Sequence, residues 1–166
     1  DVTGVQTCAL PIWLYMTKPK MEEVTDTNKS YADKKILIVD DNKLNIKVAR
    51  RAIQDFNFII DEAYNGLECI EKINAGNTYD LILMDIMMPE MSGSTALAKL
   101  KENPNFSTPV IALTADAVTG AKEKYISEGF VDYIAKPFSK DQIKEKLDII
   151  FNEKDIVSSP NFDQDF

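Results

Sequence analysis

The chain has 166 residues, of which 45% are hydrophobic, so it can bury one core of ordinary size and leaves little room for a second domain. Its 27 acidic residues outnumber 19 basic ones, and the formal charge of -8 argues against DNA as a direct partner. The absence of histidine excludes a histidine base, a histidine-ligated zinc site and a phosphohistidine within the chain.

Residues 1–33 show no sustained hydrophobic periodicity, so we predict a linker or disordered segment outside the fold. Residues 1–12 also resemble the translation of a sequencing-adapter oligonucleotide, which would make them an assembly artefact. The apolar stretch over residues 9–16 is interrupted by Pro11 and is far shorter than the ~20 residues of a membrane-spanning helix. The two cysteines are too few for a disulfide framework, so we expect a cytoplasmic protein with no membrane contact by this segment.

Residues 34–152 alternate short β-branched runs with longer stretches of helical period, which predicts one α/β domain of five βα units. The first, third and fourth strands are apolar on both faces, as central strands of a parallel sheet covered by helices on each side should be. The predicted strands cover residues 35–40, 58–63, 80–85, 109–114 and 131–135.

Two helices begin with capping signals, in which a capping side chain precedes an acid or an amide by three positions. These pairs are Asn65 with Glu68 and Ser139 with Gln142. On the two capped helices, the residues expected to face the core are Leu67, Ile70, Ile73, Ile143, Leu147 and Ile150.

Glycines mark the ends of two helices. Gly76 follows the helix that begins at Asn65, and Gly129 follows a predicted helix over residues 118–128. After the last helix, residues 153–166 contain four acids and one lysine and are expected to form a flexible acidic tail.

Charged and polar side chains follow four of the five predicted strands. Asp40 and Asp41 follow the first strand, Asp85 ends the third, Thr114 ends the fourth and Lys136 follows the fifth. Ligands bind beyond the carboxyl ends of strands in an open parallel sheet, so these groups should converge there. Three close carboxylates repel one another unless a cation neutralises them, and oxygen ligands of this kind suit Mg²⁺.

Four motifs in register give these residues a family context, because together they resemble the response-regulator receiver family of bacterial two-component signalling. The resemblance covers about the whole of residues 34–151 and implies a flavodoxin-like, doubly wound parallel sheet with strand order 2-1-3-4-5. The motifs are Ile-Leu-Ile-Val-Asp-Asp-Asn (36–42), Leu-Ile-Leu-Met-Asp-Ile-Met-Met-Pro-Glu-Met-Ser-Gly (81–93), Ala-Leu-Thr-Ala (112–115) and Tyr-Ile-Ala-Lys-Pro-Phe (133–138).

The resemblance implies a role for each residue of the acidic edge. Asp85 is then the phosphoacceptor, which takes a phosphoryl group from a phosphohistidine on a histidine kinase or a histidine phosphotransfer protein. Asp40, Asp41, Asp85 and the backbone carbonyl of Met87 bind Mg²⁺, or Mn²⁺ in its place. Lys136 pairs with a phosphoryl oxygen. The chain is expected to be a signalling phosphoacceptor rather than an enzyme.

The resemblance also implies a conformational switch. The Thr114 hydroxyl moves to hydrogen-bond the phosphoryl group, and Tyr133 rotates into the space behind it. Downstream proteins are expected to contact the helix from Val118, the fifth strand and the last helix. Pro137 is expected to form a rigid turn that aims the preceding lysine inward, with a cis peptide bond as one option.

Two further positions should set the lifetime of the acyl phosphate. Met87 and Asp116 flank the expected path of the attacking water, and the Met87 side chain offers that water no hydrogen bond. We therefore predict slow to moderate self-hydrolysis, which a half-life of seconds in purified protein would contradict.

Other functions compete for the same pattern. A haloacid-dehalogenase-type phosphatase needs a second aspartate two residues after the nucleophile, where this chain has Met87. A flavodoxin-like FMN carrier needs a phosphate loop after the first strand, where residues 41–44 begin with an acid. A pseudo-receiver that acts through protein contacts alone is the third alternative. The chain could also be a stand-alone regulator or, as we favour, the C-terminal receiver of a hybrid histidine kinase.

Overall fold

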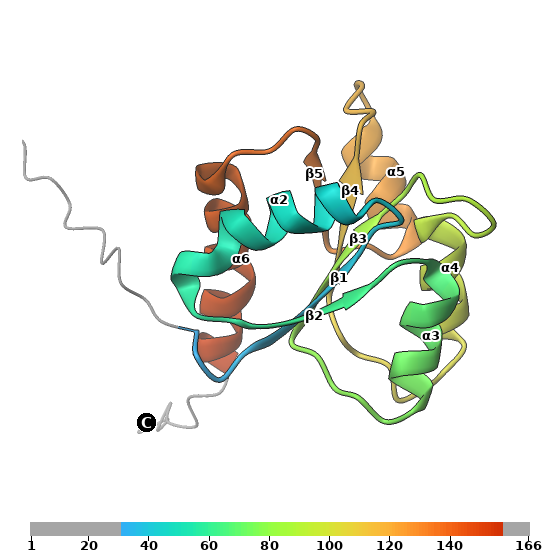
Figure 1. Cartoon of the computed structure of the whole chain (residues 1–166), viewed down its shortest axis with the longest axis horizontal. Coiled ribbons are helices and arrows are strands. Elements are labelled where there is room, and N and C mark those ends of the chain that lie inside the picture. Colours follow the sequence, from blue (N-terminus) through green and yellow to red (C-terminus); the bar gives the residue numbers. More distant parts are fainter. Residues whose placement is uncertain (1–30, 158–166) are drawn as a thin grey trace, which may run out of the picture.

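The computed structural model describes residues 31–157, which form a five-stranded parallel sheet in the order β2-β1-β3-β4-β5 with helices on both faces (Figure 1). The predicted flavodoxin-like strand order is confirmed, and each predicted strand agrees to within one residue at each end. The strands are β1 (Lys35–Val39), β2 (Ile59–Ala63), β3 (Leu81–Asp85), β4 (Val110–Thr114) and β5 (Asp132–Ala135). The helices are α2 (Lys43–Ile53), the short 3-10 helix η1 (Gln54–Phe56), α3 (Gly66–Asn74), α4 (Gly93–Lys101), α5 (Ala121–Glu128) and α6 (Lys140–Val157).

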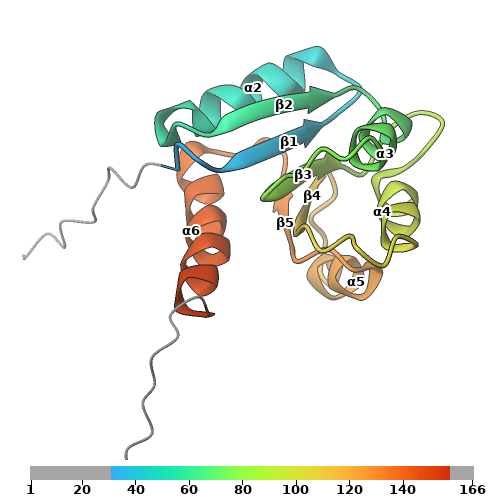
Figure 2. The same ribbon diagram turned by 90° about the horizontal axis from the view of Figure 1, so that it is seen from below.

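The two faces of the sheet support two separate hydrophobic cores, because successive strand residues point to opposite sides. Strand residues such as Ile36 and Leu83 pack with α2 and α6, whereas Leu37 and Met84 pack with α3, α4 and α5. Figure 2 shows the same division, with α2 and α6 on one side of the strands and the other three helices opposite. All residues of β3 and β4 are buried, as the two-sided apolar pattern predicted.

The predicted boundary at residue 33 is wrong, because Tyr31 belongs to the fold. Its ring is buried and stacks on Phe58 with 4.9 Å between ring centroids. Its backbone N–H donates to the Phe56 carbonyl at 2.8 Å, and its hydroxyl donates to Asp148 on α6 at 3.0 Å. This aromatic side chain therefore fixes the first described residue against the sheet and the last helix. The predictions for residues 1–30 lie outside the described residues.

The capping signals predicted both helix starts, but one core residue was assigned wrongly. Asn65 accepts the Glu68 N–H at 2.7 Å, and Ser139 and Gln142 exchange two hydrogen bonds. Leu67 is 55% exposed instead of buried, because the buried side of α3 is formed by Gly66, which lies against Met91 and Ala96, and by Cys69 in the core. On α6, Ile143 and Leu147 are buried and Ile150 packs half-buried beside them.

Two helix boundaries differ from the prediction. The helix expected over 118–128 begins at Ala121, because Gly120 before it has a φ of 89° and ends the preceding turn. Gly129 has a φ of 104° after the helix, as its position predicted. The last helix continues to Val157, so residues 153–157 are helical and not part of the predicted tail; the prediction for residues from 158 onward lies outside the described residues. Within residues 31–157, every helix is too short or too polar to span a lipid bilayer.

Candidate functional site

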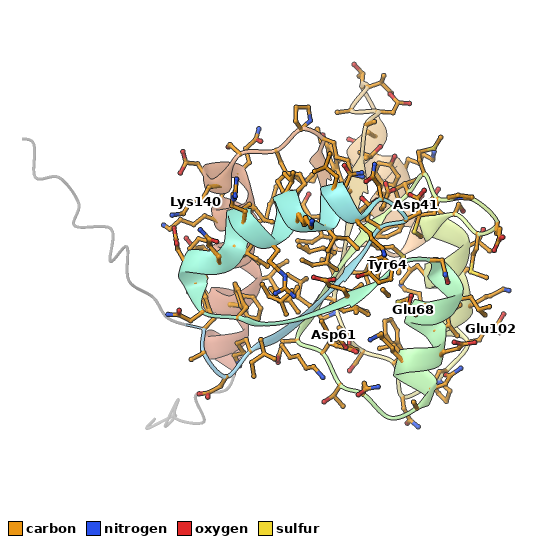
Figure 3. The ribbon with its side chains drawn as sticks, viewed as in Figure 1. Asp41, Asp61, Tyr64, Glu68, Glu102 and Lys140 are labelled. Atoms are coloured by element: carbon orange, nitrogen blue, oxygen red, sulfur yellow. The ribbon has the colours of Figure 1, made fainter. Side chains whose placement is uncertain are left out.

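Three carboxylates meet where β1 and β3 end. The two strands are paired in parallel with Val39 opposite Met84, so the next residues, Asp40 and Asp85, come to lie side by side. With Asp41, they bring one carboxylate oxygen each within 4.8 Å of one another. Asp40 and Asp85 are 1% and 4% exposed, whereas Asp41 is exposed at the start of α2, where Figure 3 labels it. The predicted convergence of these three residues is confirmed.

Lys136 extends into the same cluster from the end of β5. Its Nζ lies 2.8 Å from Asp40 Oδ2 and 3.0 Å from Asp85 Oδ1. The backbone here is fixed by the Lys136 N–H, which donates to the Thr114 carbonyl at 2.7 Å. The Lys136–Pro137 peptide bond is cis, one of the options predicted for Pro137. The ammonium therefore bridges two buried carboxylates on strands that are neighbours in the sheet.

The charges of this cluster are only partly balanced. Burial raises the pKa of Asp85, as does the nearby Asp40 carboxylate, and these effects outweigh the hydrogen bond from Lys136. Burial lowers the pKa of Lys136, but its hydrogen bonds with Asp40 and Asp85 more than reverse that effect, so the net shift is upward. These contacts favour the charged form of Lys136, whereas the surroundings of Asp85 disfavour its ionised form.

The donor set fits a hard divalent cation. Three carboxylates and one ammonium leave two negative charges when all four groups are ionised, and a divalent ion would neutralise them. Mg²⁺ prefers oxygen ligands and retains water, which the exposed Asp41 side of the cluster allows. Met87 is close to this site, since its N–H donates to Asp85 Oδ1 at 3.3 Å. Its carbonyl as a metal ligand stays a prediction.

Two residues that support the acidic cluster were missed by the sequence analysis. Asn45 on α2 donates to Asp40 Oδ1 at 3.2 Å and, with the Asn42 N–H at 2.9 Å, holds one oxygen of that carboxylate. Gly93 starts α4 against the backbone of Asp85, where an added Cβ would lie 2.3 Å from the Asp85 carbonyl oxygen. The glycine stood within a quoted motif, but nothing in the sequence around Asn45 indicated its contact.

The predicted switch residues, Thr114 and Tyr133, are connected through Tyr125, which the sequence analysis did not single out. The buried Thr114 hydroxyl accepts a hydrogen bond from the Tyr125 hydroxyl at 2.9 Å and from the Asp116 N–H at 3.0 Å. The Tyr125 ring packs against the half-buried Tyr133 ring with 5.9 Å between centroids. Asp116 and Met87 are both exposed, with Met87 74% exposed.

The sequence model of the response regulator receiver domain family matches residues 36–148 of this chain. The chain belongs to this family. The receiver domain is 35% identical over 136 residues to hybrid signal transduction histidine kinase B of Dictyostelium discoideum, covering 75% of this chain and 7% of that protein. It is also 35% identical over 122 residues to the histidine-protein kinase BarA of Escherichia coli K12, covering 73% of this chain and 13% of that protein. One of these relatives comes from a eukaryote, so the family alone does not confine the chain to bacteria.

Solved receiver domains share the fold over nearly their whole length. The receiver domain of the Francisella response regulator 1452 is 32% identical, with a TM-score of 0.66, and the match covers 73% of this chain and 98% of that one. The receiver domain of the sensor histidine kinase PA1611 from Pseudomonas aeruginosa PAO1 is 29% identical, with a TM-score of 0.65, covering 72% and 98%. That structure is described as holding a magnesium ion in its active-site cleft.

Proposed function

We propose that this receiver domain accepts a phosphoryl group on Asp85 from a phosphohistidine of a partner protein. The observation that carries the proposal is the contact of Lys136 with Asp85 in a buried cluster with Asp40 and Asp41. In the transfer, an Asp85 oxygen forms a bond to phosphorus while the bond from phosphorus to the histidine nitrogen breaks, and the electron pair stays on the imidazole. Because this chain has no histidine, the donor is a separate histidine-containing domain.

The residues that would hold Mg²⁺, or Mn²⁺ in its place, are Asp40, Asp41, Asp85 and the Met87 carbonyl. The bound ion supplies positive charge next to the oxygens of the transferred phosphoryl group. Within the protein, the Asn42 N–H and Asn45 fix the orientation of Asp40, and Asp40 in turn helps to fix the ammonium of Lys136. Lys136 is therefore placed to contact a phosphoryl oxygen on Asp85 as the in-line transfer proceeds.

The domain is, on this proposal, a signalling phosphoacceptor that takes part in its own modification rather than an enzyme with a separate substrate. Thr114 and Tyr133 would convert the phosphorylation into a surface change. Exposed apolar residues on the predicted output surface include Val118, Ile126 and Val131, which are 63%, 46% and 46% exposed. Downstream proteins would contact this surface of α5, β5 and α6.

The phosphoacceptor is tested by incubating the purified domain with acetyl phosphate, with and without Mg²⁺. Intact mass spectrometry should show one added phosphoryl group on the wild type with Mg²⁺, and none on Asp85→Asn, because the amide lacks the nucleophilic oxygen anion. Asp33→Asn changes an exposed aspartate before β1 and is the matched control, which should be labelled like the wild type. Labelling that persists in Asp85→Asn would place the acceptor elsewhere, and no labelling of the wild type would favour a pseudo-receiver.

A groove beside the acceptor site fits the phosphodonor protein. It has a volume of about 790 Å³ and runs along α2 to Lys140 at the start of α6. Figure 3 shows Asp41 and Lys140 near opposite ends of α2. Leu44 and Val48 are 65% and 49% exposed on this helix, and basic residues surround them although the chain is acidic overall. An apolar centre with a basic rim suits a donor with an acidic rim around an apolar helix face. The basic residues are Lys47, Arg50, Arg51 and Lys140, and the groove also contains one acid, Asp55, which pairs with Lys140.

Donor docking is tested by comparing a protein donor with a small one. Leu44→Asp should lower the rate of transfer from a phosphorylated histidine phosphotransfer domain about tenfold or more, because docking would bury an unpaired carboxylate against the apolar face of the donor. The same variant should react with acetyl phosphate at the wild-type rate, because the carboxylate cluster is unchanged. Leu67→Asp introduces the same charge at an exposed leucine of α3 and should leave both rates unchanged. Equal loss in both assays would indicate damage to the site instead of the interface.

A further inference from the structure

The Thr114 hydroxyl has no free hydrogen-bonding capacity in this structure. It donates its proton to the Asp116 carbonyl at 3.2 Å and accepts hydrogen bonds from the Asp116 N–H at 3.0 Å and from the Tyr125 hydroxyl at 2.9 Å. A hydroxyl has one proton and two acceptor positions, so all three are in use. Thr114 can contact a phosphoryl group on Asp85 only after it leaves at least one of these partners.

The Tyr125 hydroxyl depends on Thr114 in the same way. Tyr125 is 3% exposed, and within residues 31–152 its hydroxyl makes no other hydrogen bond. A buried donor that loses its partner is strongly disfavoured, so Thr114 and Tyr125 are expected to rearrange together. The Asp116 N–H, by contrast, lies on an exposed residue of the loop after β4, where water can replace the threonine.

Neighbouring rings extend this dependence to the switch aromatic. The Tyr125 ring meets Phe130 edge-on, with 5.9 Å between centroids, and packs against Tyr133 at the same separation. Tyr125 also lies on α5, the helix expected to change position on activation. A displacement of the Tyr125 side chain would therefore act directly on the rings of Phe130 and Tyr133 and on α5.

We propose that Tyr125 is a positioning residue that holds Thr114 in its resting conformation. Its hydroxyl releases Thr114 when Asp85 becomes phosphorylated, and this release couples the acceptor site to α5. The release of Thr114 rests on the proposed phosphorylation of Asp85, whereas the hydrogen bond between Tyr125 and Thr114 in the resting state does not. This role gives Tyr125 a part of the switch that Thr114 and Tyr133 alone do not explain.

The test is Tyr125→Phe, which removes the hydroxyl and keeps the ring. With Mg²⁺ present, the variant should bind beryllium fluoride, a mimic of the phosphoryl group, about three- to tenfold more tightly than the wild type, because one resting-state hydrogen bond no longer opposes the change. In a Thr114→Ala background, the same substitution should have no effect on that affinity. Unchanged or weaker binding by Tyr125→Phe would overturn the proposal.

A second measurement needs neither metal nor phosphate. In the resting wild type, NMR side-chain couplings of Thr114 should report one χ1 rotamer, and in Tyr125→Phe they should report averaging between rotamers. A single fixed Thr114 rotamer in the variant would overturn the proposal that the Tyr125 hydroxyl holds Thr114 in its resting conformation. If the wild type fails to bind beryllium fluoride, the proposed phosphorylation is wrong, yet the NMR result still decides the role of Tyr125.

The matched control is Tyr79→Phe. Tyr79 is also a buried tyrosine, and its hydroxyl donates to Asp61 at 2.6 Å, next to the start of β3 and so at the end opposite Asp85. This variant loses an equivalent hydrogen bond and should lower the unfolding temperature without changing beryllium fluoride affinity or the Thr114 rotamer. An equal gain in affinity in Tyr79→Phe would show that general loosening, rather than release of Thr114, explains the effect.

Discussion

Replacement of Lys136 by methionine is expected to destabilise the metal-free domain by about 3 kcal/mol, because removing one partner of a buried ion pair leaves the other charge uncompensated. The Lys136 ammonium lies within 3.0 Å of both Asp40 and Asp85, whose side chains are almost fully buried, so two carboxylates lose their counter-charge at once. Methionine retains much of the aliphatic volume and removes the ammonium. The variant should also be phosphorylated about 100-fold more slowly, as expected when a donor to the transferred group is lost.

Urea unfolding in EDTA measures the stability effect, and time-resolved labelling with acetyl phosphate and Mg²⁺ measures the rate. The control is Lys140→Met, which removes a lysine paired with Asp55 where both side chains are about half exposed. Exposed pairs contribute less than about 1 kcal/mol, so this variant should remain near the wild type. Mg²⁺ should restore part of the stability lost by Lys136→Met. A Lys136 variant as stable as the Lys140 variant would show that the acidic cluster does not need the ammonium.

The sequence predicted those parts of the fold that depend on short-range patterns. Strand ends carry Asp40, Asp85 and Thr114 to one edge because parallel strands share a direction, and no tertiary information is needed for that step. Capping residues such as Ser139 mark helix starts for a similarly local reason, since their side chains bond to backbone groups three residues away.

Short-range sequence patterns did not predict the contacts between segments that are distant in the sequence. Tyr31 packs on Phe58 and on Phe151, and Phe151 lies at the other end of the domain in the sequence. A lone tyrosine in a polar stretch of sequence does not indicate either contact. In the sequence, Tyr125 is one apolar position on a predicted helix. Its hydroxyl finds its partner Thr114 only because α5 packs next to the end of β4 in the folded domain. The prediction of Leu67 as a core residue failed because helical spacing fits more than one face of a short helix.

Asp85→Asn is expected to stabilise the metal-free domain at neutral pH, by about 1 kcal/mol, while abolishing phosphorylation. The pKa of Asp85 is raised above its ordinary value of 3.8, mainly by burial, so the folded state disfavours the ionised carboxylate even with Lys136 beside it. A neutral amide of the same shape avoids that penalty, and the Lys136 ammonium keeps Asp40 as its partner at 2.8 Å, so the substitution leaves no unpaired buried charge.

The pH dependence gives the sign of the effect. Below pH 3.8, Asp85 is protonated in both the folded and the unfolded chain, so wild type and variant should differ least there. As the pH rises from that value to the raised folded pKa, the unfolded chain releases the proton while the folded chain retains it. The wild type therefore loses stability relative to Asp85→Asn across this interval, and the difference is constant at higher pH.

Mg²⁺ should reverse the order of the two proteins, because the ion binds ionised carboxylates and the variant lacks one of them. At ten times its dissociation constant, a ligand specific to the folded state adds about 1.4 kcal/mol, so the wild type should become the more stable protein. Asp41→Asn is the matched control: this exposed aspartate should matter little in EDTA but should weaken the response to Mg²⁺. If the wild type is already the more stable protein in EDTA at neutral pH, Lys136 alone balances the buried charge. The acidic cluster would then no longer be an argument for a bound cation.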